Sequence, residues 1–510
     1  MTNENTANNK RIAKNTIFLY LRMVVVLLVS LYTTRVVLNV LGVVDYGIYN
    51  VVAGFVCMFA FLNSALTNAT QRFYNFERAS GTQESLVDIY NTSLRIQALL
   101  GLTIIILLET FGLWYIYTKM VIPPDRVWAA IWVFQCSSVS LVLLVLQTPY
   151  AAAIISHEKM DYYALVSIID VFVKFVIVII LPYISYDQLV FYGITSLLVS
   201  LLNFILYFYY AKHNFAEIRL RKCFNKKVFR SMLSFTGWNT LDSFAYMMQG
   251  QGLNVLMNSF FGPIVNSARA VAFQVQGAIN GFSENIAMAF RPQLVGSYAE
   301  QNYMRTQTLM FSMSKYCFLM VTALSIPIAI ELPYILNLWL KGVVPEYTTI
   351  FTILVLANMS LNSLNMPISQ TVQATGFVKY YQLIRSVIVT ATLPIAWLFL
   401  HFGFSPTSVF WVTLAITVIN QPVSMVILHE HFHYSYGKYI RSVIIPCCLF
   451  VMLSIILPYC VHCIMADSFI RLCVVGAVSL LSSAAIAYYV ILGKAEKDVL
   501  VKYVIKIIRR

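Results

Sequence analysis

The chain has 510 residues, of which 59% are hydrophobic and only 11% are charged. Water-soluble domains carry about 25% charged residues, so this composition excludes a soluble protein. The formal net charge is +14. In a membrane protein such an excess is typical of cytoplasmic loops, and no nucleic-acid partner is expected.

Apolar segments long enough to cross a membrane follow one another along almost the whole chain. About 20 apolar residues in a helix span a hydrocarbon core of ~30 Å, and within lipid a helix satisfies its own backbone hydrogen bonds. We therefore predict an all-α polytopic membrane protein with about fourteen transmembrane helices. Their approximate bounds are 15–41, 44–66, 94–117, 127–152, 162–184, 187–210, 232–260, 264–288, 312–339, 348–373, 383–403, 407–428, 440–462 and 469–492.

The basic residues predict the orientation of these helices. With the amino terminus in the cytoplasm, about 27 Lys and Arg lie on cytoplasmic segments and about 4 on outer loops. The opposite orientation would reverse this bias. We predict a multi-pass protein with both termini in the cytoplasm.

The connection between the sixth and seventh helices, residues 211–231, is among the longest and most basic. It is either a topology anchor or a hinge between two six-helix lobes. Gly42 and Gly262 each lie between two long helices, which favours parallel repeats like those of one transporter class. The predicted organisation is a cytoplasmic amino terminus (1–14), an N-lobe (15–210), a basic inter-lobe loop (211–231), a C-lobe (232–428), a cytoplasmic loop (429–439), two further helices (440–492) and a basic cytoplasmic tail (493–510).

Ionisable residues inside the predicted helices mark candidate site positions, because a charge at mid-membrane costs at least ~2.5–3.5 kcal/mol. Arg22, Lys174 and Arg269 are candidate cavity cations for an anionic substrate such as a phosphate. Asp170 precedes Lys174 by one helical turn, which suits an internal ion pair. The alternative is that Lys174 is shared with an anionic ligand.

Acidic and amide side chains form a second group of candidates. They predict a polar cavity or packed polar interface, since such side chains cannot face lipid cheaply. The group consists of Asp242, Glu284, Asp170, Asn239, Gln249 and Gln251.

Three stretches resemble a known family: residues 41–52 (LGVVDYGIYNVV), 61–73 (FLNSALTNATQRF) and 234–275. They are similar to bacterial polysaccharide-biosynthesis flippases of the O-antigen type, in the multidrug/oligosaccharidyl-lipid/polysaccharide exporter superfamily. The resemblance implies a MATE-like fold, with two six-helix lobes around a central cavity and two added helices. It also implies that arginines of the first and eighth helices, here Arg22 and Arg269, line that cavity.

The function implied by this resemblance is transport rather than enzymatic catalysis. The substrate would be an undecaprenyl-pyrophosphate-linked oligosaccharide, flipped from the cytoplasmic to the periplasmic leaflet of a bacterial inner membrane for O-antigen, capsule or exopolysaccharide synthesis. Polysaccharide polymerases and glycosyltransferases would be its partners. No metal or cofactor is expected, but Na⁺ or H⁺ coupling through Asp242 or Glu284 is a hypothesis. The alternatives are an ion-coupled multidrug exporter and a membrane glycosyltransferase or polysaccharide polymerase.

Overall fold

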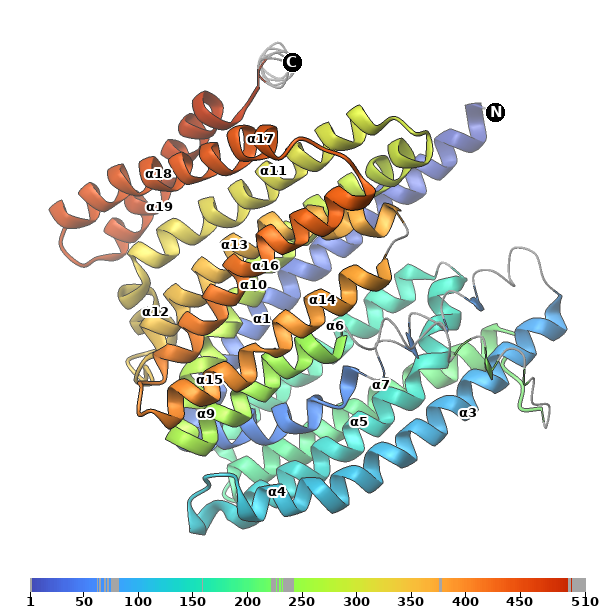
Figure 1. The fold of residues 1–510 in the computed structure, drawn as a ribbon. Helices are drawn as coiled ribbons and strands as arrows, with labels where there is room; N and C mark the ends of the chain where they lie inside the picture. The colour runs from blue at the N-terminus through green and yellow to red at the C-terminus, as the bar shows by residue number, and fades with distance from the viewer. Residues whose placement is uncertain are drawn as a thin grey trace. The chain divides into compact units, whose positions relative to one another are not determined.

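The computed structural model describes residues 2–61, 63, 66–67, 70, 73–74, 82–157, 159–221, 226, 229–230, 232, 243–375, 378–493 and 497. Side chains are described in these ranges from Leu27 onward, except at 160, 284–285, 287–289, 291–292, 295–296, 299, 378 and 431. Every regular element in these ranges is helical, which confirms the predicted all-α class (Figure 1). The long helices are α1 (Thr2–Cys57), α3 (Gln83–Leu107), α5 (Val127–Ser156), α6 (Met160–Ile180), α7 (Gln188–Asn214), α9 (Leu253–Phe261), α10 (Pro263–Ala299), α11 (Tyr303–Ile330), α12 (Leu332–Leu340), α13 (Thr348–Thr375), α14 (Val378–Thr390), α15 (Thr392–His401), α16 (Thr407–His431), α18 (Ile445–Ile464) and α19 (Phe469–Ile486). Short elements are α4 (Leu113–Thr118), α17 (Tyr436–Tyr439), the π-helices η1 (Leu108–Gly112), η4 (Met248–Gly252), η5 (Ile440–Ile444) and η6 (Ala487–Ile491), and the 3₁₀ turns η2 (Pro124–Arg126) and η3 (Leu181–Tyr183).

Eleven helices in the described residues are long and apolar enough to cross a membrane. The predicted first and second helices are joined without a loop: α1 is interrupted only at Gly42, with φ 75° and ψ 173°. This backbone conformation favours glycine because it has no Cβ. The sequence predicted the position of this break, because the boundary between the first two predicted helices falls at residues 42–43.

The chain forms two compact units. Unit 1 contains residues 1–270 and 389–406, and unit 2 contains residues 271–388 and 407–510. In unit 1, α5 packs against α7 and α3, and α1 packs against α5 and α6. The lobe boundaries predicted from the sequence stay a prediction.

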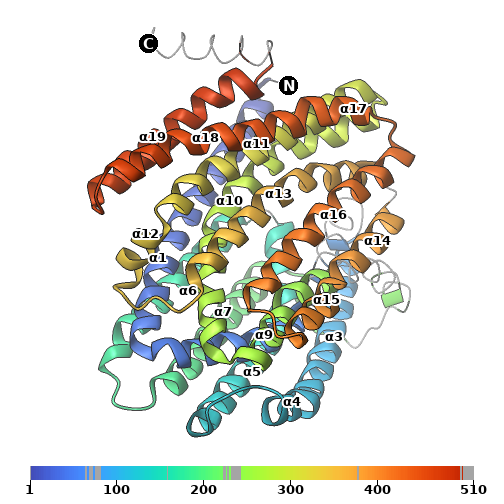
Figure 2. The same cartoon turned by 60° about the vertical axis from the view of Figure 1, so that its left-hand side comes forward.

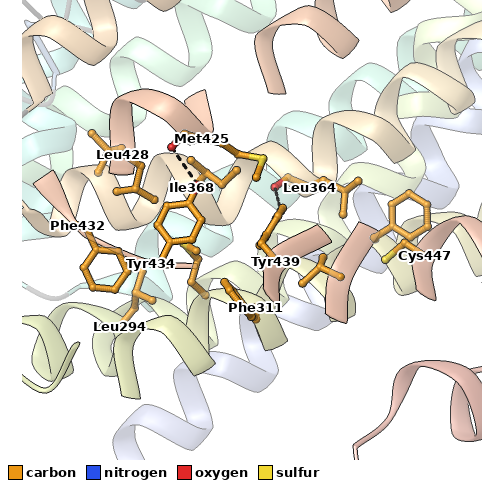
Figure 3. Packing of buried hydrophobic residues seen from close by; sticks show 14 of the residues in the cluster. Leu294, Phe311, Leu364, Ile368, Met425, Leu428, Phe432, Tyr434, Tyr439 and Cys447 are labelled. Atoms are coloured by element: carbon orange, nitrogen blue, oxygen red, sulfur yellow. Dashed lines mark hydrogen bonds between the residues drawn. The ribbon is translucent and has the colours of Figure 1, made fainter. Parts of the chain in front are cut away.

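The core of unit 2 lies between α11, α13, α16 and the carboxy-terminal helices. Tyr439 is fully buried, and its hydroxyl donates to the carbonyl of Leu364 at 3.4 Å (Figure 3). Tyr434 similarly donates to the carbonyl of Met425 at 3.0 Å. These tyrosines bury apolar rings while their hydroxyl groups stay hydrogen-bonded. In the same unit, α18 and α19 lie side by side and both contact α11 (Figure 2).

A local twofold relation appears in unit 1 where the two glycine breaks meet. Gly262 has φ 75° and ψ −172°, close to the values at Gly42, 220 residues earlier. The hydroxyl of Ser267 donates to the carbonyl of Val43, and Gly47 approaches the carbonyl of Pro263. Val43 and Pro263 are also 220 residues apart, as are Gly47 and Ser267. The two contacts therefore join the same pair of repeat positions, with the two halves of the chain exchanged.

Substitution of Gly47 is expected to destabilise this contact. A Cβ at position 47 would lie 1.9 Å from the carbonyl oxygen of Pro263, so the two backbones must separate. We expect Gly47→Ala to lower the free energy of unfolding by about 1–3 kcal/mol or more. Thermal unfolding in detergent measures the change. The matched control is Gly277→Ala, because a Cβ there meets nothing within 4 Å. Equal stability of both variants would contradict the close approach.

The beginning of the basic inter-lobe loop is bound to unit 1. Asn91 on α3 accepts a hydrogen bond from the backbone N–H of Arg221 and donates to the carbonyl of Arg219, each at 2.8 Å. Glu217 is buried and lies 2.6 Å from the ring of His157. These contacts hold residues 215–221 against α3 and the carboxy-terminal end of α5.

Candidate functional site

The site candidates predicted from the sequence divide into two groups. The side chains of Arg22, Asn239, Asp242 and Glu284 lie outside the described residues, so their roles stay predictions. The described candidates are Lys174, Asp170, Arg269, Gln249 and Gln251.

A cavity of about 670 Å³ lies within unit 1, between α1, α5, α6 and α7. Ligand sites commonly enclose ~300–1,000 Å³, so its volume suits a small molecule or part of a larger one. Asp170 and Lys174 line this cavity, whereas Arg269, Gln249 and Gln251 do not. Asp170 is ten residues into α6, or about 15 Å at ~1.5 Å per residue, which is mid-depth in a ~30 Å core.

Asp170 joins two helices through its carboxylate. Lys174 Nζ lies 2.8 Å from one oxygen, and Asn203 Nδ2 on α7 donates to the other at 2.6 Å. The side chain of Lys174 is 54% exposed, so its ammonium group can reach the cavity while it remains paired. An ion pair is one way that membrane proteins hold charges inside the bilayer. This contact is the internal ion pair that the i,i+4 spacing predicts.

The sequence interpretation missed Asn203 and the serines beside it. Ser196, Ser200 and Asn203 recur every three or four residues along α7 and line the same cavity. A polar stripe at helical spacing in an otherwise apolar segment indicates a side that avoids lipid. That spacing was the available signal.

Arg269 lies on α10 and is buried beside the π-helix η4. It is 6% exposed, and its Nη2 donates to the carbonyl of Gly250 at 2.5 Å. Gly250 lies in the π-helix η4, and π-helical turns alter the backbone hydrogen-bond pattern and frequently occur at functional sites. Gln249, also in η4, donates to the hydroxyl of Thr392 at 3.1 Å. These contacts join the π-helix η4 to α10 and α15 within unit 1.

Three buried asparagines next to this π-helix were not singled out from the sequence. Asn266 Nδ2 donates to the side-chain oxygen of Asn254 at 2.8 Å, and Asn258 Nδ2 donates to Asn266 Oδ1 at 3.1 Å. Asn258 also accepts from the backbone N–H of Val121 at 3.0 Å. Buried amides need such partners, so this network specifies how α9 and α10 pack.

An ion cluster in unit 1 connects α1 to the amino-terminal ends of α5 and α7. Arg126 Nε donates to Asp45 at 2.8 Å, and Nη1 donates to Asp187 at 2.7 Å. Asp187 also caps α7 by accepting from the backbone N–H groups of Leu189 and Val190. Burial alone would raise the pKa of Asp187, but Arg126 and these N–H groups lower it below its usual value.

Removing the guanidinium group of this cluster is expected to destabilise unit 1. Arg126→Gln would leave Asp45 and Asp187 as neighbouring, partly buried carboxylates with no cation between them. We expect a loss of about 1–2 kcal/mol in the free energy of unfolding, reduced from the buried-pair value by solvent screening. Thermal unfolding in detergent tests this. Arg221→Gln is the matched control, because Arg221 is 57% exposed and lies 3.6 Å from an exposed Glu84. Similar melting temperatures for both variants would contradict the prediction.

A second buried cluster lies in unit 2. Glu331, at the junction of α11 and α12, is fully buried. Arg471 Nη2 donates to it at 2.9 Å, and the ring of His462 lies 2.8 Å from its other oxygen. Arg471 also pairs with Asp467. The cluster joins α11 and α12 to the α18–α19 pair.

The described residues contain no group of three or more His, Cys, Asp or Glu side chains arranged to hold a metal ion. No protein-family model matches the sequence, and no curated protein matches it.

Solved structures do show a similar fold. "Lipid II flippase MurJ, inward closed conformation" matches with a TM-score of 0.71 at 13% identity, over 94% of this chain and 98% of that chain. An inward-facing multidrug-resistance MATE family transporter of the MOP superfamily matches with a TM-score of 0.64 at 14% identity, over 79% of this chain and 95% of that chain. An outward-facing MATE transporter has a TM-score of 0.55 at 16% identity, over 84% and 97%. The chain therefore has the fold that the lipid II flippase shares with the MATE transporters.

Proposed function

We propose that this chain flips an undecaprenyl-pyrophosphate-linked oligosaccharide from the cytoplasmic to the periplasmic leaflet of a bacterial inner membrane. The product would supply synthesis of an O-antigen, capsule or other exopolysaccharide. The observation that carries the proposal is the polar cavity at mid-membrane depth, with Asp170, Lys174 and Asn203 in hydrogen-bond contact. A lipid with a polar head needs such a passage, while its apolar tail can remain in lipid.

The fold supports the same proposal, because a lipid II flippase matches 94% of the chain. In transporters built from repeats, one repeat rocks against the other around a site near the midplane. The two six-helix lobes predicted from the sequence would perform that motion here. Arg22 and Arg269 remain our candidates for contact with the pyrophosphate, and Asp242 or Glu284 for Na⁺ or H⁺ coupling.

The multidrug-exporter alternative has one observation in its favour, which is the match to MATE transporters. A cationic drug would need an acid that is not already neutralised. The only acid lining the described cavity, Asp170, is paired with Lys174. We therefore favour a lipid-linked glycan as the substrate.

The test is a deletion strain in which the leaflet of the lipid-linked oligosaccharides is determined. We expect complete repeat units to accumulate on the cytoplasmic face, with reversal when the chain is restored. Truncated or absent repeat units would point to an enzyme of glycan assembly. An unchanged pool together with reduced drug efflux would support the exporter.

A further inference from the structure

The cavity in unit 1 is lined by polar stripes from three helices. Each stripe follows helical spacing, so the polar atoms of each helix point into one space. The stripes are Ser137, Ser140 and Gln147 on α5, Ser167, Asp170 and Lys174 on α6, and Ser196, Ser200 and Asn203 on α7.

The serine hydroxyl groups of α6 and α7 have already used their donor hydrogens. Ser167 donates to the carbonyl of Tyr163 at 3.0 Å, Ser196 to that of Tyr192 at 2.7 Å, and Ser200 to that of Ser196 at 3.1 Å. A hydroxyl group has one donor and two acceptor lone pairs. Each of these serines therefore offers the cavity lone pairs that accept hydrogen bonds, and no free hydrogen.

Asn203 places a further acceptor beneath the lining of the cavity. Its amide nitrogen donates to Asp170, while its Oδ1 is buried with no hydrogen-bond partner among the described residues. A buried polar atom without a partner is costly and is a rare feature that needs an explanation. Because this atom is closed off from the cavity surface, the serine hydroxyl groups rather than Asn203 offer the accessible acceptors.

The charges of the lining balance each other. Lys174 is the only cation and Asp170 the only acid among the residues that line the cavity, and they are paired. A pyrophosphate presents only acceptors and negative charge, so it suits a cationic, donor-rich site. The lining here is neutral and rich in acceptors. A molecule with many hydroxyl donors matches it better than a phosphate does.

The aromatic residues of the lining suit the same ligand. The rings of Tyr49 and Tyr192 lie with their centroids 4.8 Å apart, and both residues line the cavity. Their rings offer apolar surface and their hydroxyl groups offer polar contacts. A sugar has C–H faces and a rim of hydroxyl groups, and so presents both kinds of surface.

We propose that the unit 1 cavity is a saccharide-binding subsite, separate from the groups that hold the pyrophosphate. This inference rests on the proposed function, because it assigns the glycan part of the lipid-linked substrate to a specific cavity. Ser196 and Ser200 accept hydrogen bonds from sugar hydroxyl groups, and the remaining donors of Lys174 bind sugar oxygens.

Cys57 provides a local readout, since it lines the cavity and its thiol is free and exposed. The purified full-length protein would be alkylated with N-ethylmaleimide, and the rate at Cys57 measured by peptide mass spectrometry. Three probes would be compared: the extracted lipid-linked oligosaccharide pool, the oligosaccharide released from it by mild acid, and undecaprenyl pyrophosphate alone. We expect the first two to slow alkylation of Cys57 and the third to leave it unchanged. Equal protection by undecaprenyl pyrophosphate alone would overturn the proposal.

A double variant tests the acceptor atoms themselves. Ser196→Ala with Ser200→Ala removes two acceptors and keeps helix-forming residues. We expect the released oligosaccharide to need about a tenfold higher concentration for half-protection. Ser138→Ala is the matched control, because Ser138 is buried on α5, bonds to Phe134 and does not line the cavity. An unchanged half-protection concentration in the double variant would overturn the proposal.

The outcomes separate this inference from the proposed function. If the deletion strain shows no change in leaflet distribution but the oligosaccharide still protects Cys57, the flippase assignment fails and the saccharide subsite stands. If repeat units accumulate on the cytoplasmic face but only undecaprenyl pyrophosphate protects Cys57, flipping stands and the subsite fails.

Discussion

Asp170→Asn and Lys174→Met are each expected to reduce transport of the lipid-linked oligosaccharide at least about tenfold. Each change leaves its partner as an uncompensated charge near mid-membrane, where charges cost at least ~2.5–3.5 kcal/mol on insertion scales. Asp170→Asn also weakens the contact with Asn203, which connects α6 to α7. Transport is measured with the purified protein in proteoliposomes, using the extracted lipid-linked pool.

The double variant D170N/K174M separates a structural role from a role in transport. Neutralising both members removes the unpaired charge, so we expect the melting temperature to recover towards that of the unmodified protein. We expect transport to stay low, because the cavity has lost the groups that contact the substrate. Lys119→Met is the matched control, since Lys119 is exposed at the end of α4. Full transport by the double variant would mean that the pair serves only to stabilise the fold.

Glu331→Gln is expected to lower the free energy of unfolding by about 1–3 kcal/mol, because Arg471 loses its buried partner and keeps only the exposed carboxylate of Asp467. The side chains of Glu331 and Arg471 are 0% and 6% exposed, so water cannot replace the lost contact. The change would weaken the attachment of α18 and α19 to α11. Thermal unfolding in detergent, followed by limited proteolysis of the connection between α18 and α19, measures it.

Two further variants define the origin of that effect. E331Q/R471M removes both charges, and we expect it to recover most of the lost stability. Glu346→Gln is the control for loss of an acidic residue, because Glu346 is exposed in the loop before α13. A melting temperature for Glu331→Gln equal to that of the control would contradict a stabilising role for the cluster.

The sequence by itself predicted the membrane helices, and eleven helices in the described residues are long and apolar enough to be spans. It also predicted where the backbone breaks. Apolar length identifies the membrane helices, because a backbone within lipid must satisfy its own hydrogen bonds. The glycines at 42 and 262 mark the breaks in the backbone. The Asp170–Lys174 pair was also predictable, since residues four apart share one side of a helix.

Only the tertiary structure decided which side chains from different helices meet. Nothing in the chain order connects Asn203 with Asp170, or Arg471 with Glu331 140 residues earlier. The charge of Arg269 is visible in the sequence, but its contact with the carbonyl of Gly250 is visible only in the structure. The physical reason is that helical periodicity defines the sides of one helix, whereas its rotation and axial shift against its neighbours depend on how all the side chains pack.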